Sequence, residues 1–159
     1  MNTVTVLGSL HLDIVVNAAR QPLLGETLIG SGWHQVAGGK GANQAVAFAR
    51  AGLATRMLGL VGDDGFADTM IAHLCKNDVD VTHLVRMLGR GSGMSVAIVQ
   101  TDGDYAAVVA SEANGLLDAP CVDGWKELLA SSCALVLQNE ISAEANLAAA
   151  RIVPDHGGL

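Results

Sequence analysis

The residues best suited to chemistry stand close together in GGKGANQ, positions 38–44, where three glycines surround one lysine. A glycine-rich loop that opens a helix can cradle a phosphate group. A P-loop needs glycine five positions before its Gly-Lys pair and Ser or Thr after it, but His34 and Gly41 stand there around Gly39-Lys40. The dinucleotide fingerprint needs a third glycine where Gln44 stands, directly after the first strand. Neither nucleotide motif fits, so we expect a different ligand.

The same loop still has the chemistry of a binding site. Gly38, Gly39 and Gly41 allow close backbone approach to a ligand and positive φ angles. Free N–H groups of the following helix point toward the loop, and Lys40 and Asn43 add side-chain donors. These groups suit a hydroxyl-rich ligand as well as an anion. The alternative is a plain turn with a helix cap, which would need only one glycine.

The elements that position this loop alternate between strands and helices. Ala42, Ala45, Val46 and Ala49 recur at helical spacing and predict a helix over 42–51 that ends at Gly52. A short β-branched strand at 3–7, followed by a second extended stretch, precedes the loop. After it we predict strands at 54–61 and 133–138 and helices at 66–77, 120–131 and 143–152. This order predicts an α/β fold with a parallel sheet between helices.

Local signals support two of these helices. An Asp in the turn 62–65 is the predicted N-cap of the helix at 66–77, which should bury Met70, Leu74 and part of Ile71. Ser142 is the predicted N-cap of the helix at 143–152, after which 153–159 reads as a helix stop.

A hairpin interrupts the alternation. Strand-like runs at 94–100 and 105–111 flank Thr101-Asp102-Gly103-Asp104, and Asp-Gly between two such runs is a strong hairpin signal. Residues 27–37 are also extended, though broken by glycine. Both faces of the hairpin are apolar, so the domain, a ligand or another subunit must cover it.

Composition narrows the class of protein. The chain has 159 residues, half of them hydrophobic, and a net charge of −7, which argues against a nucleic-acid or anionic-membrane surface. No stretch predicts a signal peptide or a membrane span. The three cysteines are too few and too far apart for a disulfide framework or a zinc site, and we expect buried free thiols in a reducing cytoplasm.

Five stretches together carry a resemblance to a known family. They are VLGSLHLDIV (6–15), LGET (24–27), GGKGANQAVA (38–47), SEAN (111–114) and LQNE (137–140). In order and spacing the chain resembles the ribokinase-like (PfkB) carbohydrate kinases over nearly all of residues 1–150. The resemblance implies a three-layer αβα fold with a mostly parallel sheet and a small β lid, formed by about 27–37 and 94–111.

The resemblance also implies a sugar site. Asp13 would accept hydrogen bonds from two sugar hydroxyls, Gly39, Lys40 and Asn43 would close on the sugar, and Glu140 would contact a further hydroxyl. The implied substrate-binding set is His11, Asp13, Gly38, Gly39, Lys40, Gly41, Asn43 and Glu140. From the residues alone, Asp13 could instead be a turn acid, Lys40 a solvated side chain, and Glu140 a charge at a helix N-terminus.

Two positions depart from the family pattern. His11 stands where the ribokinase-like pattern has Asn, so the sugar stays open between ribose, another pentose, a hexose and a nucleoside. Glu112 stands where the family favours a small Gly before Ala-Asn.

The implied activity is ATP-dependent phosphorylation of ribose or a related sugar hydroxyl, with Mg²⁺ and a monovalent cation. The family's GAGD-type motif, which carries the catalytic base, has no counterpart in this sequence. We therefore expect residues 1–159 to be the N-terminal part of such a kinase, without the nucleotide-binding half and with no catalytic, cofactor or metal residue of their own. A sugar-binding module and an oligomerising remnant are the alternatives. The lid also implies a homodimer.

Overall fold

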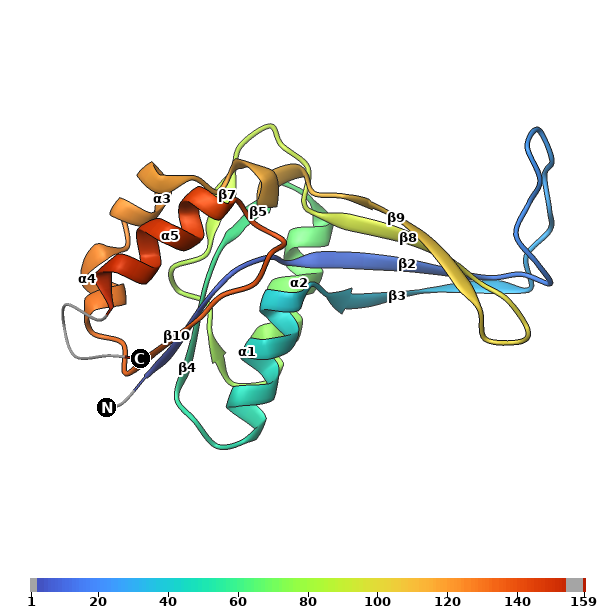
Figure 1. Cartoon of the computed structure of the whole chain (residues 1–159). Coiled ribbons are helices and arrows are strands. Elements are labelled where there is room, and N and C mark those ends of the chain that lie inside the picture. The colour runs from blue at the N-terminus through green and yellow to red at the C-terminus, as the bar shows by residue number, and fades with distance from the viewer. Residues whose placement is uncertain (1–2, 154–158) are drawn as a thin grey trace.

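The computed structural model describes residues 3–153 and residue 159, and a parallel sheet forms its centre (Figure 1). Its strands are β10 (Ala134–Val136), β1 (Val4–Leu7), β4 (Thr55–Leu58) and β6 (Val79–Asp80), in that order. Each neighbouring pair is parallel. The first strand therefore lies inside the sheet, with β4 on one side and β10 on the other.

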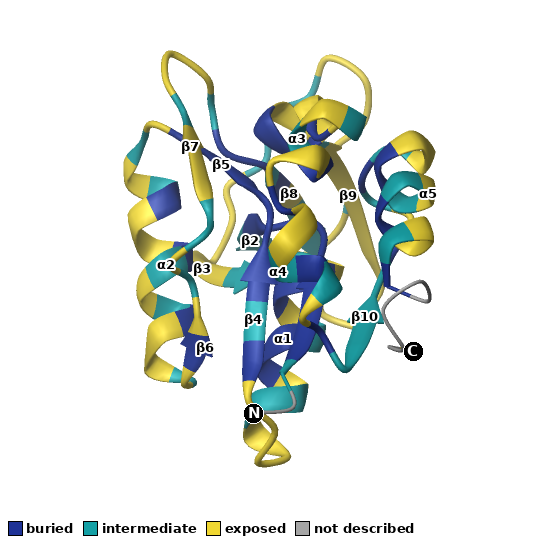
Figure 2. Ribbon diagram, turned by 90° about the vertical axis from the view of Figure 1, so that its left-hand side faces the viewer, coloured by how far each residue is buried: buried dark blue, intermediate teal, exposed yellow. Residues whose placement is uncertain are grey.

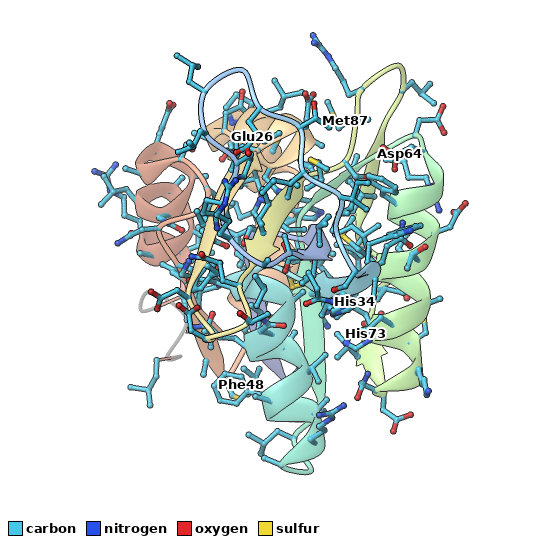
Figure 3. The ribbon with its side chains drawn as sticks, turned by 90° about the vertical axis from the view of Figure 1, so that its right-hand side faces the viewer. Glu26, His34, Phe48, Asp64, His73 and Met87 are labelled. Carbon is cyan, nitrogen blue, oxygen red and sulfur yellow. The ribbon has the colours of Figure 1, made fainter. Side chains whose placement is uncertain are left out.

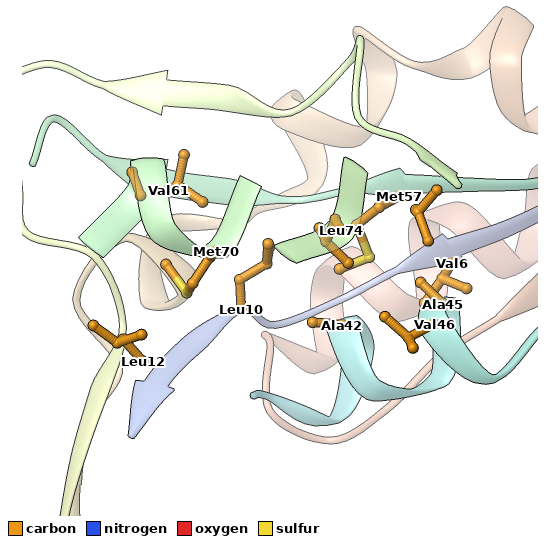
Figure 4. Packing of buried hydrophobic residues seen from close by; sticks show 12 residues of the cluster. Val6, Leu10, Leu12, Ala42, Ala45, Val46, Met57, Val61, Met70 and Leu74 are labelled. Atoms are coloured by element: carbon orange, nitrogen blue, oxygen red, sulfur yellow. The ribbon is translucent and has the colours of Figure 1, made fainter. Parts of the chain in front are cut away.

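Helices cover both faces of this sheet. Helices α1 (Lys40–Arg50) and α2 (Gly65–Lys76) pack on one face, and α3 (Ala119–Asp123), α4 (Lys126–Ala130) and α5 (Ala143–Ile152) on the other. Successive strand residues point to opposite faces. Val6 and Met57 accordingly join the cluster under α1 and α2 (Figure 4), whereas Leu7 and Leu58 join the cluster under α3 to α5. The predicted three-layer αβα architecture is confirmed, and Figure 2 shows β4 mostly buried and the outer faces of the helices exposed.

A second sheet of four strands, called the lid below, projects from this body (Figure 1). Its order is β3 (Gly32–Gly38), β2 (His11–Asn17), β8 (Met94–Val99) and β9 (Tyr105–Ala110). The predicted hairpin is confirmed as β8 and β9, and its turn places Gly103 at φ 94°. The strand expected over 27–37 begins only at Gly32. The stretch after β1 proved to be the lid strand β2, paired with both β3 and β8.

Helix boundaries follow the predicted local signals closely. Asp64 caps α2 by accepting a hydrogen bond from the Ala67 N–H at 2.9 Å, and Figure 3 shows it at the start of that helix. Ser142 caps α5 through the Ala145 N–H at 3.1 Å. Gly52 follows α1 with φ 84°, as a helix stop requires.

Three local expectations were wrong. The strand predicted at 54–61 divides at Gly59, because β5 (Leu60–Gly62) leaves the central sheet to pair with β7 (Val85–Met87). The helix predicted at 120–131 is two short helices, α3 and α4, and a 3₁₀ helix, η1 (Glu112–Leu116), precedes them. The cysteines are free, but Cys75 is exposed and the other two are only half-buried, because α2 turns Cys75 away from the apolar face that Met70 and Leu74 bury.

Met70 and Leu74 are buried as expected, and Ile71 packs partly buried against the same cluster. The predicted helix stop at 153–159 lies mostly outside the described residues. The main chain of Leu159 is hydrogen-bonded to Cys133 and Leu135 beside β10. No helix in the described part of the chain is both long and apolar enough to cross a bilayer.

Candidate functional site

The carboxylate of Glu140 joins three segments of the chain beyond the end of β10. Its Oε2 accepts hydrogen bonds from the Ser9 hydroxyl at 2.6 Å and from the Lys40 main-chain N–H at 2.9 Å. Its Oε1 lies 2.5 Å from the Lys40 ammonium. Lys40 is the first residue of α1, so Glu140 accepts a hydrogen bond from a main-chain N–H at the N-terminus of that helix. The helix α5, which follows Glu140 in the chain, is capped by Ser142 instead.

These contacts determine the charge state of the pair. Partial burial raises the pKa of Glu140, but hydrogen bonds from Lys40 and Ser9 outweigh it and lower the pKa to about 2. The hydrogen bond that Lys40 donates to Glu140, together with the negative charge of that carboxylate, raises the pKa of Lys40. Glu140 and Lys40 are therefore a carboxylate and an ammonium at neutral pH. In these forms Glu140 can accept a hydrogen bond from a hydroxyl, and Lys40 can donate one.

The glycines of the loop permit close approach to the chain's own connection between β1 and β2. A Cβ on Gly41 would lie 2.7 Å from the main-chain N and O of Ser9. Gly39 adopts φ 90°, and a Cβ there would lie 2.8 Å from the His11 N and the Ser9 O. A Cβ on Gly38 would lie 2.6 Å from Asp13 Oδ2. Gly39 and Gly41 are therefore required where α1 begins, because a Cβ at either would meet main-chain atoms of residues 8–11, whereas at Gly38 the Asp13 side chain would have to move.

Asp13 lies on the lid, between its neighbours Val36 on β3 and Ser95 on β8. Its Oδ1 accepts a hydrogen bond from the Ser95 hydroxyl at 2.6 Å, and its other oxygen covers Gly38. Asp13 is thus part of a strand rather than a turn, with one oxygen placed over the glycine loop. Asn43 is exposed on the first turn of α1.

His11 is the first residue of β2 and is only 4% exposed. Its Nδ1 lies 3.7 Å from Glu140 Oε2, and its Nε2 lies 3.4 Å from the amide nitrogen of Asn114. Burial lowers the pKa of His11, and the nearby carboxylates Glu140 and Asp13 offset this only in part. His11 is therefore neutral at neutral pH.

A cavity of about 450 Å³ opens beside His11 and Glu140. Such a volume lies within the range of small-molecule pockets. The end of the lid strand β9 and the segment that follows it form one wall. The lining residues are His11, Val109, Ser111, Gly115, Asn139, Glu140, Ile141 and Ser142.

A larger cavity of about 720 Å³ lies between the β6–β7 connection (82–85) and residues 123–128, and none of the predicted site residues lines it. Among residues 3–153 and 159, no group of three His, Cys, Asp or Glu side chains is placed to hold a metal ion.

The structure therefore brings most of the predicted residues together. His11 and Lys40 both lie beside Glu140, and Asp13 lies beside Gly38 at the start of the glycine loop. Of the predicted residues, His11 and Glu140 line the 450 Å³ cavity, whereas Asp13, Lys40 and Asn43 do not. Sequence reasoning missed Ser9, Ser95 and Asn114, which orient these side chains. Ser9 and Asn114 stand inside two of the motifs quoted above, so those motifs carried a signal for them.

The chain matches one family model and several known proteins over nearly its whole length. The model of the pfkB family of carbohydrate kinases matches residues 1–157. The chain is 36% identical to the ribokinase of Schizosaccharomyces pombe and 34% identical to that of Lactococcus lactis. These matches cover 99% and 98% of this chain but 51% and 52% of the relatives.

Among solved structures, Arabidopsis thaliana ribokinase complexed with ribose and ATP superposes with a TM-score of 0.91 at 28% identity. That match covers 99% of this chain and 51% of that one. The chain thus spans about half the length of the relatives it matches.

Proposed function

The chain belongs to the PfkB family of carbohydrate kinases, and we propose that its residues form the sugar-binding part of an ATP-dependent kinase that phosphorylates a hydroxyl of ribose or a related sugar. The observation that carries this proposal is the cavity beside Glu140 and His11. Its lining residues His11 and 139–142 follow the carboxyl ends of β1 and β10, and the sheet order turns at β1, with β4 on one side and β10 on the other. Ligands of open α/β sheets bind beyond the carboxyl ends of the strands at such a point.

Each site residue has a role in this proposal that its chemistry allows. Asp13 accepts hydrogen bonds from sugar hydroxyls with the oxygen that lies over Gly38. Lys40 and Asn43 donate from the first turn of α1, and Glu140 accepts from a further hydroxyl. Gly39 and Gly41, like Gly38, act by letting the loop pack closely enough to bring these groups together.

The lid would hold the sugar and exclude water above it. Asp13 lies on β2 with one oxygen over Gly38, and Val109 and Ser111 at the end of β9 line the cavity. Phosphoryl transfer depends mainly on positioning and electrostatic stabilisation, so a fixed sugar hydroxyl is this chain's contribution to it.

We assign the nucleotide to a part of the kinase outside these 159 residues. The Arabidopsis relative described above was solved with ribose and ATP, which supports ATP as the phosphoryl donor. ATP, Mg²⁺ and a monovalent cation are assigned to the half of the family's length that these 159 residues do not match. No residue of this chain is proposed to hold them or to act as the catalytic base.

The test is calorimetric titration of the chain with ribose and related sugars. We expect binding that Asp13→Asn weakens about tenfold or more, since the amide replaces an acceptor with a mixed donor and acceptor. Asp102→Asn, in the exposed β8–β9 turn, is the control and should bind like the unmodified chain. No heat at millimolar sugar would overturn the sugar site. ATP-dependent phosphorylation of ribose by these 159 residues alone would overturn the division of roles.

We also infer that two copies pair through their lids. Side chains alternate along the lid strands, and the face opposite Asp13 carries Trp33, Val96 and Val108, which are 66%, 39% and 76% exposed. The Asp13 face also carries exposed Val36, Tyr105 and Val109, but that face is assigned to the sugar. The exposed apolar side chains on the opposite face indicate an interface. This observation also favours the oligomerising role considered as an alternative.

A further inference from the structure

This inference rests on the proposed sugar site and concerns the one position where that site departs from the family pattern. An asparagine at position 11 would present both a donor and an acceptor to a ligand. A neutral histidine presents one donor and one acceptor, and which of its nitrogens is which depends on its neighbours. The neighbours of His11 are placed so that they decide this.

Asn114 determines the orientation of the ring. Asn114 is fully buried, and its side chain makes two hydrogen bonds to the main chain of Leu10. Its Oδ1 accepts from the Leu10 N–H at 3.0 Å, and its Nδ2 donates to the Leu10 carbonyl at 2.7 Å. Because these two bonds fix which end of the amide is nitrogen, the atom facing His11 Nε2 at 3.4 Å is a donor. His11 Nε2 must then accept, and the ring proton lies on Nδ1.

The other side of the ring faces the cavity. Nδ1 lies 3.7 Å from Glu140 Oε2, which is longer than a hydrogen bond, and both residues line the cavity. The gap is too short for an oxygen in line between the two atoms, but a hydroxyl in the cavity beside them can lie within hydrogen-bond distance of both. A ligand hydroxyl at this point would accept from His11 Nδ1–H and donate to the carboxylate. The charged groups that face His11 are Glu140, Asp13 and Lys40.

We propose that His11, held by Asn114 as the Nδ1–H tautomer, is a specificity-determining residue that requires a hydroxyl of the substrate in the cavity, in contact with both itself and Glu140. His11 gives that hydroxyl one hydrogen bond and accepts none from it. A sugar that lacks this hydroxyl leaves the nearly buried Nδ1–H of His11 without an acceptor, whereas Glu140 Oε2 keeps its hydrogen bonds from Ser9 and Lys40. Sites built in this way reject the deoxy analogue strongly, so we expect at least a tenfold loss of affinity.

The first test measures the tautomer and needs no sugar. Nitrogen chemical shifts of the imidazole rings distinguish Nδ1–H from Nε2–H, and His11→Asn identifies the His11 signals among the five histidines. We expect the Nδ1–H form at neutral pH. Asn114→Asp replaces the donor with an acceptor and should move the ring proton to Nε2. An Nε2–H or charged His11 in the unmodified chain would overturn the proposal.

The second test combines His11→Phe with monodeoxy sugars. Titration of the unmodified chain with ribose and its monodeoxy analogues should show one analogue bound at least tenfold more weakly. In His11→Phe the affinity for that analogue should lie within about threefold of the affinity for ribose. The losses of affinity for the other monodeoxy analogues should stay as they are in the unmodified chain. A positioning effect without a hydrogen bond would weaken all the sugars alike, and that result would refute the role of His11.

The two proposals fail in different ways. If the unmodified chain binds no sugar, the proposed function is overturned, and the specificity role falls with it. If the chain binds ribose but His11→Phe leaves every deoxy penalty unchanged, the sugar site stands and only the role of His11 is overturned.

Discussion

Replacing Glu140 by glutamine should destabilise the fold in a pH-dependent way. The substitution keeps the shape of the side chain but removes the charge that Lys40 and Ser9 contact. The pKa of Glu140 lies at about 2 in the folded chain against an ordinary 4.5, which corresponds to at most about 3 kcal/mol. The Lys40 side chain is 68% exposed, so solvent screens part of this. We therefore expect a loss of about 1–2 kcal/mol at pH 7.

The sign of the pH dependence follows from the lowered pKa. A carboxylate whose pKa is lower in the folded than in the unfolded state stabilises the fold above pH 4.5 and loses that effect as the pH falls toward 2. The difference between the unmodified chain and Glu140→Gln should therefore be largest at pH 6 to 7. It should shrink to less than about half by pH 3.

Urea unfolding, measured at several pH values between 7 and 3, tests this directly. Glu144→Gln is the matched control, because Glu144 is exposed on α5 and its removal should cost no more than about 0.5 kcal/mol. Equal unfolding free energies for Glu140→Gln and the unmodified chain at pH 7 would refute the reasoning. A deficit that stays constant down to pH 3 would refute it as well, since it would come from packing and not from charge.

Three further predictions concern backbone and surface. Gly41→Ala should lower the free energy of unfolding by about 2 kcal/mol or more, because its Cβ would meet the Ser9 backbone at 2.7 Å. Gly65→Ala is the control in the same assay: its Cβ would enter open space, so the free energy of unfolding should change by no more than about 0.5 kcal/mol. Glu112→Gly should raise the unfolding free energy by about 1 kcal/mol, since Glu112 adopts φ 44°; an unchanged or lower value would contradict this. Val108→Glu should give a monomer in light scattering while Ala107→Glu, on the opposite lid face, stays dimeric; identical masses for the two variants would exclude that face as the interface.

Local patterns in the sequence were enough for much of the fold. The i, i+3, i+4, i+7 spacing from Ala42 predicted α1, and an Asp-Gly turn predicted the β8–β9 hairpin. Ser142 was predicted as a cap for the same reason, as was an Asp in the turn 62–65, which proved to be Asp64, because a cap interacts with a main chain only three residues away. The order of these elements then indicated the three-layer fold, since parallel strands joined by helices have few other solutions.

Sequence patterns were weaker where an element depends on what it packs against. The residues of β2 were recognised as extended but not as a lid strand, because membership of a sheet depends on the partners β3 and β8. Gly59 breaks the strand predicted at 54–61, and a Cβ there would meet the Gly8 carbonyl at 2.6 Å. That contact with β1 cannot be read from the sequence around Gly59.

The motifs by themselves predicted the residues of the candidate site: the glycine loop with Lys40, and the acidic residues Asp13 and Glu140. Only the tertiary structure decided how they act. Glu140 meets Lys40 across 100 residues of sequence, and Asn114 meets Leu10 across 104. Periodicity and spacing describe neighbours along the chain, whereas these hydrogen bonds arise when strand register brings distant segments to one edge of the sheet. The tautomer of His11, which depends on the direction of one buried amide, is decided only there.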